Sequence, residues 1–193
     1  MGIVELIGVA ASVSLLSGWR LYLCVFATGL AMRGGWIEAP QHLAGLDILA
    51  SPWILGISGV GLIAEFFADK VAWLDTAWDG IHTLVRPVGG ALLAMAIVDP
   101  QDQSWQLAMM LLGGSGALLS HGAKMGTRAA VNTSPEPFSN IVVSTGEDIA
   151  TGGLLLLALA NPVIAVVIAV LLAAAAIALI LFLRRLLRRM RAR

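Results

Sequence analysis

Six hydrophobic runs occupy most of this 193-residue chain and constrain its fold more than any other feature. They cover residues 3–32, 49–68, 83–98, 105–131, 138–160 and 162–183. A helix needs roughly 20 apolar residues to cross the hydrocarbon layer of a bilayer, which is about the length of these runs. The polar stretches between them are too short for a soluble domain. We therefore expect one all-α integral membrane domain, residues 1–193, with about six transmembrane helices.

The composition excludes most soluble folds. Hydrophobic residues make up 59% of the chain and charged residues only 12%. Soluble domains carry about 25% charged residues, so a soluble fold of this size could not cover so much apolar surface. The single cysteine, Cys24, excludes an intramolecular disulfide and a cysteine-based metal cluster. The glycines form no phosphate-binding or dinucleotide fingerprint, so we expect no cofactor. We assign their clusters at 113–116 and 152–153 to close helix packing.

The basic residues predict the orientation of the chain. Half of the twelve lie in the tail 184–193. Cytoplasmic segments carry an excess of Lys and Arg, so the tail predicts a cytoplasmic C-terminus, and six crossings would place the N-terminus there too. The stretches 69–86 and 124–137 then lie in the cytoplasm with basic residues, while 99–104, which carries acids and no base, lies outside. The tail directly follows a membrane span, which indicates contact with lipid headgroups rather than with nucleic acid.

Three segments predict irregular helices. The runs 3–32 and 105–131 are long for one crossing, and small or polar residues interrupt both, Ser17-Gly18 in the first and 120–122 in the second. We expect these helices to be kinked or broken there. In 70–82, tryptophans recur near helical spacing opposite acidic residues, which predicts a short helix at the membrane surface.

Similar features recur in the same order in the two halves of the chain, 1–98 and 105–183. A Leu-Leu-Ser triplet lies in the first run of each half, a Ser-Pro pair follows it, and an acidic residue lies in the next run, Glu65 or Glu147. Three crossings in each half would invert the second half relative to the first. Inverted three-helix repeats are typical of transporters, which bind their substrates near the midplane.

Charged residues inside the runs are the candidate site. Charges in a membrane helix are expensive and usually face a cavity or a partner. His121, Lys124 and Arg128 share one face of a helix, and Arg20 lies within the first run. We expect Arg20 and Lys124 to bind an anionic group, with Glu65 and Glu147 coupling protons or cations. Asp148, next to Glu147, is a further candidate of the site. The alternative is that these charges form structural ion pairs. For Asp69-Lys70 and Arg128, headgroup contact at the cytoplasmic surface is the favoured interpretation.

The segment 132–140, NTSPEPFSN, contains two prolines that forbid a regular helix. Glu136, Ser139 and Asn140 lie in it and are candidate ligand-binding residues. The alternative is an ordinary loop in which Ser139 or Asn140 caps the next helix.

The runs SHGAKMGTR at 120–128, NTSPEPFSN at 132–140 and GED at 146–148 resemble a family of small bacterial inner-membrane proteins known only as a domain of unknown function. The stretch Ser17–Arg20 resembles the opening motif of that family, and the resemblance covers nearly the whole chain. It implies a location in the bacterial inner membrane and supports the importance of Lys124, Arg128, Glu136, Ser139, Asn140, Glu147 and Asp148. It implies no activity.

These patterns predict a small transporter or translocase that moves an ion, a small solute or a lipid-linked anion through a polar site at the midplane. The alternative is a membrane scaffold or lipid-binding protein whose buried charges are structural. An intramembrane enzyme acting on lipid stays a third hypothesis, since no nucleophile–base pair stands out. Membrane lipids are the expected partners, and the small-residue faces would allow a homodimer.

Overall fold

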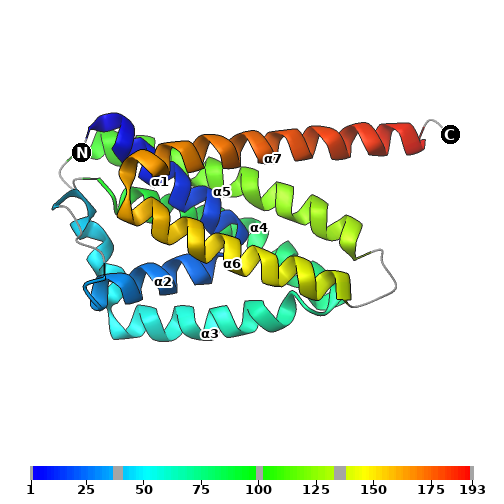
Figure 1. Cartoon of the computed structure of the whole chain (residues 1–193), viewed down its shortest axis with the longest axis horizontal. Coiled ribbons are helices and arrows are strands. Elements are labelled where there is room, and N and C mark those ends of the chain that lie inside the picture. The colour runs from blue at the N-terminus through cyan, green and yellow to red at the C-terminus, as the bar shows by residue number, and fades with distance from the viewer. Residues whose placement is uncertain (1, 37–40, 99–101, 133–137, 192–193) are drawn as a thin grey trace.

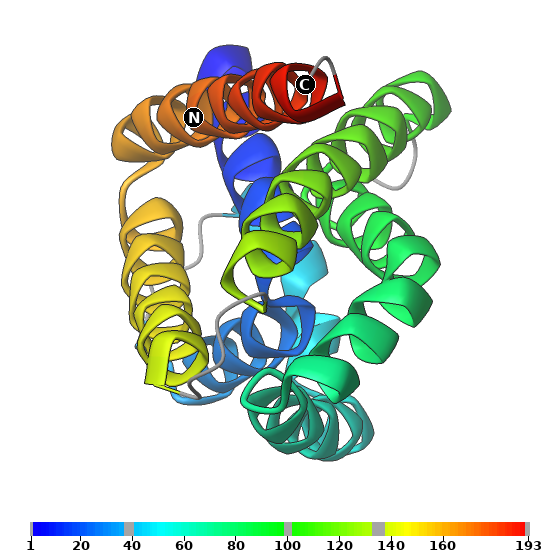
Figure 2. The ribbon, with the colours of Figure 1, turned by 90° about the vertical axis from the view of Figure 1, so that its right-hand side faces the viewer.

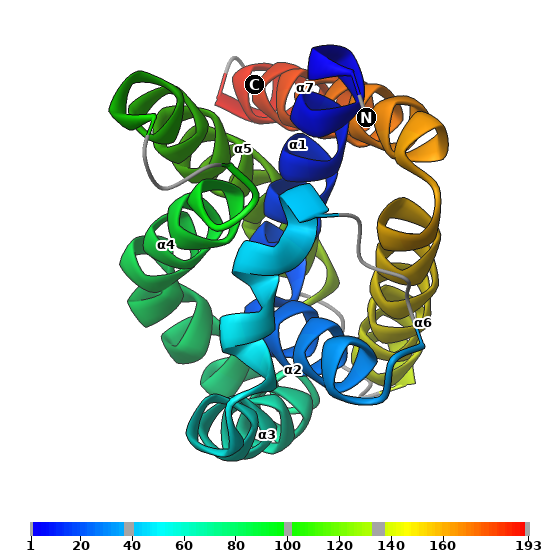
Figure 3. The same cartoon turned by 90° about the vertical axis from the view of Figure 1, so that its left-hand side faces the viewer.

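The structure is a computed structural model that describes residues 2–36, 41–98, 102–132 and 138–191. The described residues form a bundle of α-helices with one 3₁₀-helix, η1, across one end (Figures 1 and 3). In chain order the elements are α1 (Ile3–Trp19), α2 (Leu21–Arg33), η1 (Gln41–Ala50), α3 (Pro52–Ala68), α4 (Ala72–Met95), α5 (Gln103–Val131), α6 (Phe138–Ala160) and α7 (Pro162–Arg191). This confirms the predicted all-helical class.

The first hydrophobic run is two helices that meet at Arg20. Its backbone, with φ −140° and ψ 76°, leaves the helical region between α1 and α2. In Figure 1, α1 runs from the left end of the molecule to its middle and α2 returns to the left end. Close contacts agree with this path. The first part of α1 lies beside the start of α7, where Gly8 approaches Val166. α2 runs antiparallel to α3, because Tyr22 at its start lies near Gly61 and Gly29 near its end lies near Leu55. The predicted break lies at Arg20, just after Ser17-Gly18, which stay within α1. It is sharper than a kink, because residues 3–33 form a hairpin with Arg20 at its apex.

Two other predicted irregularities are wrong. α5 continues without interruption through 120–122, because Ser120 contacts α1 instead of breaking its own helix: its hydroxyl donates to the Leu15 carbonyl oxygen at 2.6 Å. The segment 70–82 is not a separate surface helix but the first half of α4, which continues past Pro87. Its acidic residues point into the protein, as described below.

Glycines bring the central helices together. A side chain at Gly18 would collide with Ser120 and with the backbone of Ala117, so α1 and α5 touch there without intervening side chains. Gly90 of α4 and Gly113 of α5 approach each other in the same way. The packing role predicted for 113–116 is therefore confirmed at Gly113. It is wrong at Gly152 and Gly153, where a side chain would meet no atom within 4 Å.

The exterior is apolar and the interior contains charge. Trp53, Leu84 and Ile149 are 82%, 78% and 72% exposed, whereas Arg20 and Glu65 are fully buried. Within the described part of the chain, α6 and α7 are long and apolar enough to cross a membrane. Soluble domains rarely bury so many charged side chains.

The two halves differ in their helices. Residues 1–98 contain α1, α2, η1, α3 and α4, while 105–183 contain α5, α6 and most of α7. The inverted repeat therefore stays a prediction. α1 begins at one end of the bundle and α7 ends beyond the other (Figure 1).

Candidate functional site

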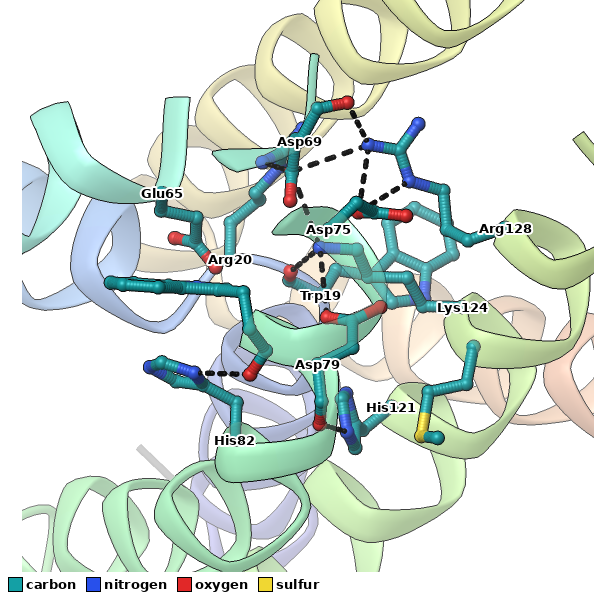
Figure 4. A network of polar contacts seen from close by, with 12 residues as sticks. Trp19, Arg20, Glu65, Asp69, Asp75, Asp79, His82, His121, Lys124 and Arg128 are labelled. Carbon is teal, nitrogen blue, oxygen red and sulfur yellow. Dashed lines mark hydrogen bonds and ion pairs between the residues drawn. The ribbon is translucent and has the colours of Figure 1, made fainter. Parts of the chain in front are cut away.

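A network of charged side chains fills the interior beside the apex of the α1–α2 hairpin (Figure 4). Helical spacing places the contributors of each element on one face. The α4 residues Asp75, Asp79, His82 and Arg86 follow at intervals of four, three and four. α5 contributes His121, Lys124 and Arg128, α3 contributes Glu65 at its buried face, and α6 contributes Ser144, Glu147 and Asp148. Asp69 lies directly after α3.

Arg20, at the apex, contacts three carboxylates and one carbonyl group. Its Nη1 forms an ion pair with Asp69, and its Nη2 donates to the Ser144 carbonyl oxygen at 2.8 Å. It also lies 3.2 Å from a carboxylate oxygen of Glu147 and, through Nε, 3.0 Å from Asp148. One fully buried guanidinium therefore holds carboxylates from two distant segments at the point where the hairpin turns.

Arg86 organises the second part of the network. It pairs with Glu65 at 2.7 Å and with Asp79 at 3.0 Å. Its Nη1 also donates to Nδ1 of His121 at 2.6 Å, which requires a neutral imidazole with its proton on Nε2. That Nε2 then donates to the Asp79 carbonyl oxygen at 3.1 Å.

Lys124 and Arg128 join the two parts. Lys124 Nζ lies 3.3 Å from a carboxylate oxygen of Asp69 and 3.6 Å from one of Asp79. Arg128 pairs with Asp75 at 3.1 Å and donates to the Asp69 carbonyl oxygen at 2.6 Å. Arg128 is 1% exposed, so the interpretation that it contacts headgroups is wrong.

The fully buried charges balance, but the whole network does not. The buried cations are Arg20, Arg86, Lys124 and Arg128, and the buried carboxylates are Glu65, Asp69, Asp75 and Asp79. Three partly exposed charged residues border this core: Lys70, and the acids Glu147 and Asp148, whose side chains are 14% and 23% exposed. With all acids ionised and the histidines neutral, this set therefore carries one carboxylate in excess.

Two carboxylate oxygens of the network have no hydrogen-bond donor among the described residues. They are Oε2 of Glu65 and Oδ1 of Asp69, both fully buried. An unsatisfied buried acceptor is destabilising, and more so when it is charged. These two oxygens could therefore accept hydrogen bonds from, or coordinate, a further positively charged group.

Lys70 lies in the turn between α3 and α4, at the edge of the network. Its ammonium lies 3.3 Å from the centre of the Phe66 ring and donates to Oγ of Ser144 at 3.2 Å. Burial lowers the pKa of Lys70 below its usual value, while the nearby Asp148 carboxylate acts in the opposite direction.

The sequence identified much of this site. Eight candidates come together in or beside the network: Arg20, Glu65, His121, Lys124, Arg128, Asn140, Glu147 and Asp148. Ser139 precedes Asn140 in the first turn of α6, and Glu136 lies outside the described residues. Asp75, Asp79, His82 and Arg86 were missed, although their helical spacing was a signal for a common buried face. Asp69 was assigned to the membrane surface and is instead buried.

Comparison with known proteins gives a family and no activity. No curated protein and no solved structure matches the chain. The model of one family, described as "Domain of unknown function (DUF4126)", matches residues 7–181. This confirms the predicted membership in a family of unknown function. The chain belongs to the DUF4126 family.

Proposed function

We propose that this protein is a membrane transporter that moves a proton or a small cation through the charged network at the hairpin apex. The observation that carries the proposal is the excess of one carboxylate in an otherwise paired network. Binding one positive charge would complete the balance. Ionisable groups inside membrane bundles typically mark ion or proton pathways.

The arrangement of helices supports this setting. In the proposed topology α3 to α7 cross the membrane and the α1–α2 hairpin enters from one side only. Non-helical backbone at membrane depth, such as that at Arg20, is tolerated where it is enclosed by protein or lines a water-filled cavity. From Pro162 to Arg184, α7 spans about 33 Å, close to the roughly 30 Å of the hydrocarbon layer.

The sidedness follows from the charges. The turn with Lys70 and the arginine tail lie at one end of the bundle, which the positive-inside bias favours for the cytoplasm. With five crossings the N-terminus then lies on the opposite side. The proposal keeps the cytoplasmic C-terminus predicted from the sequence and moves the N-terminus outside, because the first run turns back at Arg20.

The contacts favour a cation over an anion as the transported ion. Arg20 and Lys124, the two residues expected to bind an anionic group, already face carboxylates in this structure. An anion would have to displace one of these acids. A cation, by contrast, would find Glu147 and Asp148 partly exposed and sharing a single arginine.

The same contacts suggest how occupancy could be coupled to movement. Glu147 and Asp148 hold Arg20, and Arg20 is the apex of the hairpin. A cation or proton bound to these two carboxylates would weaken their attraction for Arg20 and leave it paired mainly with Asp69. The apex would then be held to α6 only by the hydrogen bonds to Ser144, while its ion pair with Asp69 after α3 stays, which gives the hairpin two positions.

The balance of the fully buried core supports the second candidate, a scaffold or lipid-binding protein with structural ion pairs. The two functions differ in ligand-linked stability. A ligand at a hundred times its Kd adds about 2.7 kcal/mol to the free energy of unfolding. We expect sodium or potassium to stabilise the detergent-solubilised protein in a thermal unfolding titration, and Glu147→Gln to abolish this effect.

Asp47→Asn, which neutralises an exposed carboxylate on η1, is the matched control and should respond like the wild type. Equal stabilisation of the wild type and Glu147→Gln would remove Glu147 from the site. If neither sodium nor potassium stabilises the protein, the proton remains the proposed ion. Proton transport is tested by the flux measurement described in the Discussion.

A further inference from the structure

An apolar pocket opens on the side of the bundle next to the charged network. It has a volume of about 470 Å³, within the range of small-molecule sites. Its lining residues are Leu23, Leu62, Ile63, Phe66, Phe67 and Asp148. They come from α2, α3 and α6, and α2 lies between the other two helices (Figures 2 and 3).

The outer rim of the pocket faces the surroundings of the protein. Ile63 and Phe67 are 60% and 63% exposed, so the pocket is reached through the side of the bundle rather than from its ends. In the proposed topology this side faces the lipid. A ligand with an apolar body could therefore move into the pocket directly from the bilayer.

The inner end of the pocket is polar and negatively charged. Asp148 is the one charged residue in its lining, and the other lining residues are apolar. The Asp148 carboxylate shares Arg20 with Glu147 and Asp69, and since Asp69 is also paired with Lys124, Glu147 and Asp148 are the two acids there that depend on one arginine. Lys70 is the other cation nearby, and it forms no ion pair with Asp148 within 4.0 Å.

The position of Lys70 indicates which ligand chemistry the inner end accepts. Its ammonium lies over the face of Phe66, an arrangement in which the ring quadrupole attracts a positive charge. The protein's own cation therefore already lies over one of the aromatic residues that line the pocket. The Lys70 side chain is partly exposed, so it can move away, and another positive charge can then take the same place.

We propose that this pocket binds a lipophilic organic cation, whose charge replaces the Lys70 ammonium over Phe66 beside Asp148 and whose apolar body contacts Leu62 and Ile63. The inference deepens the proposed function by naming a substrate class, and it rests on that function for the step of transport. Binding at the pocket can be measured without transport, so the two can fail separately.

The experiment is equilibrium binding of radiolabelled tetraphenylphosphonium to the purified full chain in a neutral detergent. We expect Asp148→Asn to weaken binding about tenfold, because the ligand loses its counter-charge in a poorly solvated site. We expect Lys70→Gln to bind several-fold more tightly than the wild type, because the competing ammonium is removed. The neutral analogue triphenylphosphine oxide should bind weakly and respond to neither variant.

Steric controls separate this pocket from the general apolar surface. Leu62→Trp should fill the pocket and abolish binding, whereas Leu84→Trp, on the exposed face of α4, should not change it. All variants are first compared with the wild type by size-exclusion chromatography. Should Asp148→Asn fail to fold, the opposite responses of Lys70→Gln and Leu62→Trp still decide the outcome.

The inference is overturned if tetraphenylphosphonium does not bind, if Lys70→Gln weakens binding, or if Leu62→Trp and Leu84→Trp bind equally well. Binding with the expected pattern but without cation flux would support the pocket and contradict transport. Flux of small cations without tetraphenylphosphonium binding would support transport and contradict this substrate class.

Discussion

Removal of Arg20 tests how much the network contributes to the fold. Methionine at this position keeps much of the side-chain volume but leaves Asp69, Glu147 and Asp148 without their shared cation. Breaking a buried ion pair by removing one partner destabilises a protein by about 3–5 kcal/mol, because the other charge stays buried. Asp69 is fully buried and dominates this loss, while the partly exposed Glu147 and Asp148 contribute less.

We therefore expect Arg20→Met to lower the free energy of unfolding by about 3–5 kcal/mol in a reversible denaturation assay in mixed micelles. The double variant Arg20→Met/Asp69→Asn should recover part of this loss, since it removes a buried carboxylate that has lost one of its cations and keeps only Lys124 and Arg128 nearby. Pairs in contact typically couple by about 0.5–3 kcal/mol. Arg33→Met, at an exposed arginine, is the control and should change stability by less than about 0.5 kcal/mol. An Arg20→Met effect as small as that of the control, or no recovery in the double variant, would refute the reasoning.

Three further predictions concern packing, topology and lipid contact. Gly18→Ala should lower the thermal midpoint, because its new methyl group meets Ser120 and the Ala117 backbone, and such overpacking costs about 1–3 kcal/mol. Gly122→Ala is the control: its methyl group meets no atom within 4 Å, so it should raise stability by up to about 1 kcal/mol. In a Cys24→Ser background, a cysteine at Glu5 and one at Lys70 should react with a membrane-impermeant maleimide from opposite sides of the membrane; labelling from the same side would contradict the hairpin topology. Replacing the four exposed arginines between 184 and 189 by glutamine should reduce stabilisation by anionic phospholipid, at about 1 kcal/mol for each charge near the surface, and an unchanged response would exclude headgroup contact by the tail.

The sequence predicted the helical class and much of the site because both follow from local spacing. Lys124 and Arg128 lie on one helical face with His121, and charges in an apolar run must turn inward wherever the runs pack together. The same reasoning applied to α4 would have found Asp79 and Arg86. It missed them because the tryptophans of 70–82 suggested a separate surface helix.

The hairpin could not be predicted from local signals. The chain turns back at Arg20, which is neither glycine nor proline, and the small residues just before it lie inside α1. What holds the apex is a set of partners distant in sequence, Asp69, Ser144 and Glu147. The number of crossings, and with it the side of the N-terminus, therefore depends on tertiary contacts that hydropathy does not contain.

The most direct test of cation transport through the network is ion flux in proteoliposomes. Wild type, Glu147→Gln and the control Asp47→Asn are reconstituted at equal density, and uptake of radioactive sodium or rubidium is recorded together with internal pH from a trapped dye. The account predicts movement of protons or of one of these cations with wild type and with Asp47→Asn, and its loss with correctly folded Glu147→Gln. Flux no greater than that of empty liposomes, or equal flux with all three proteins, would contradict it.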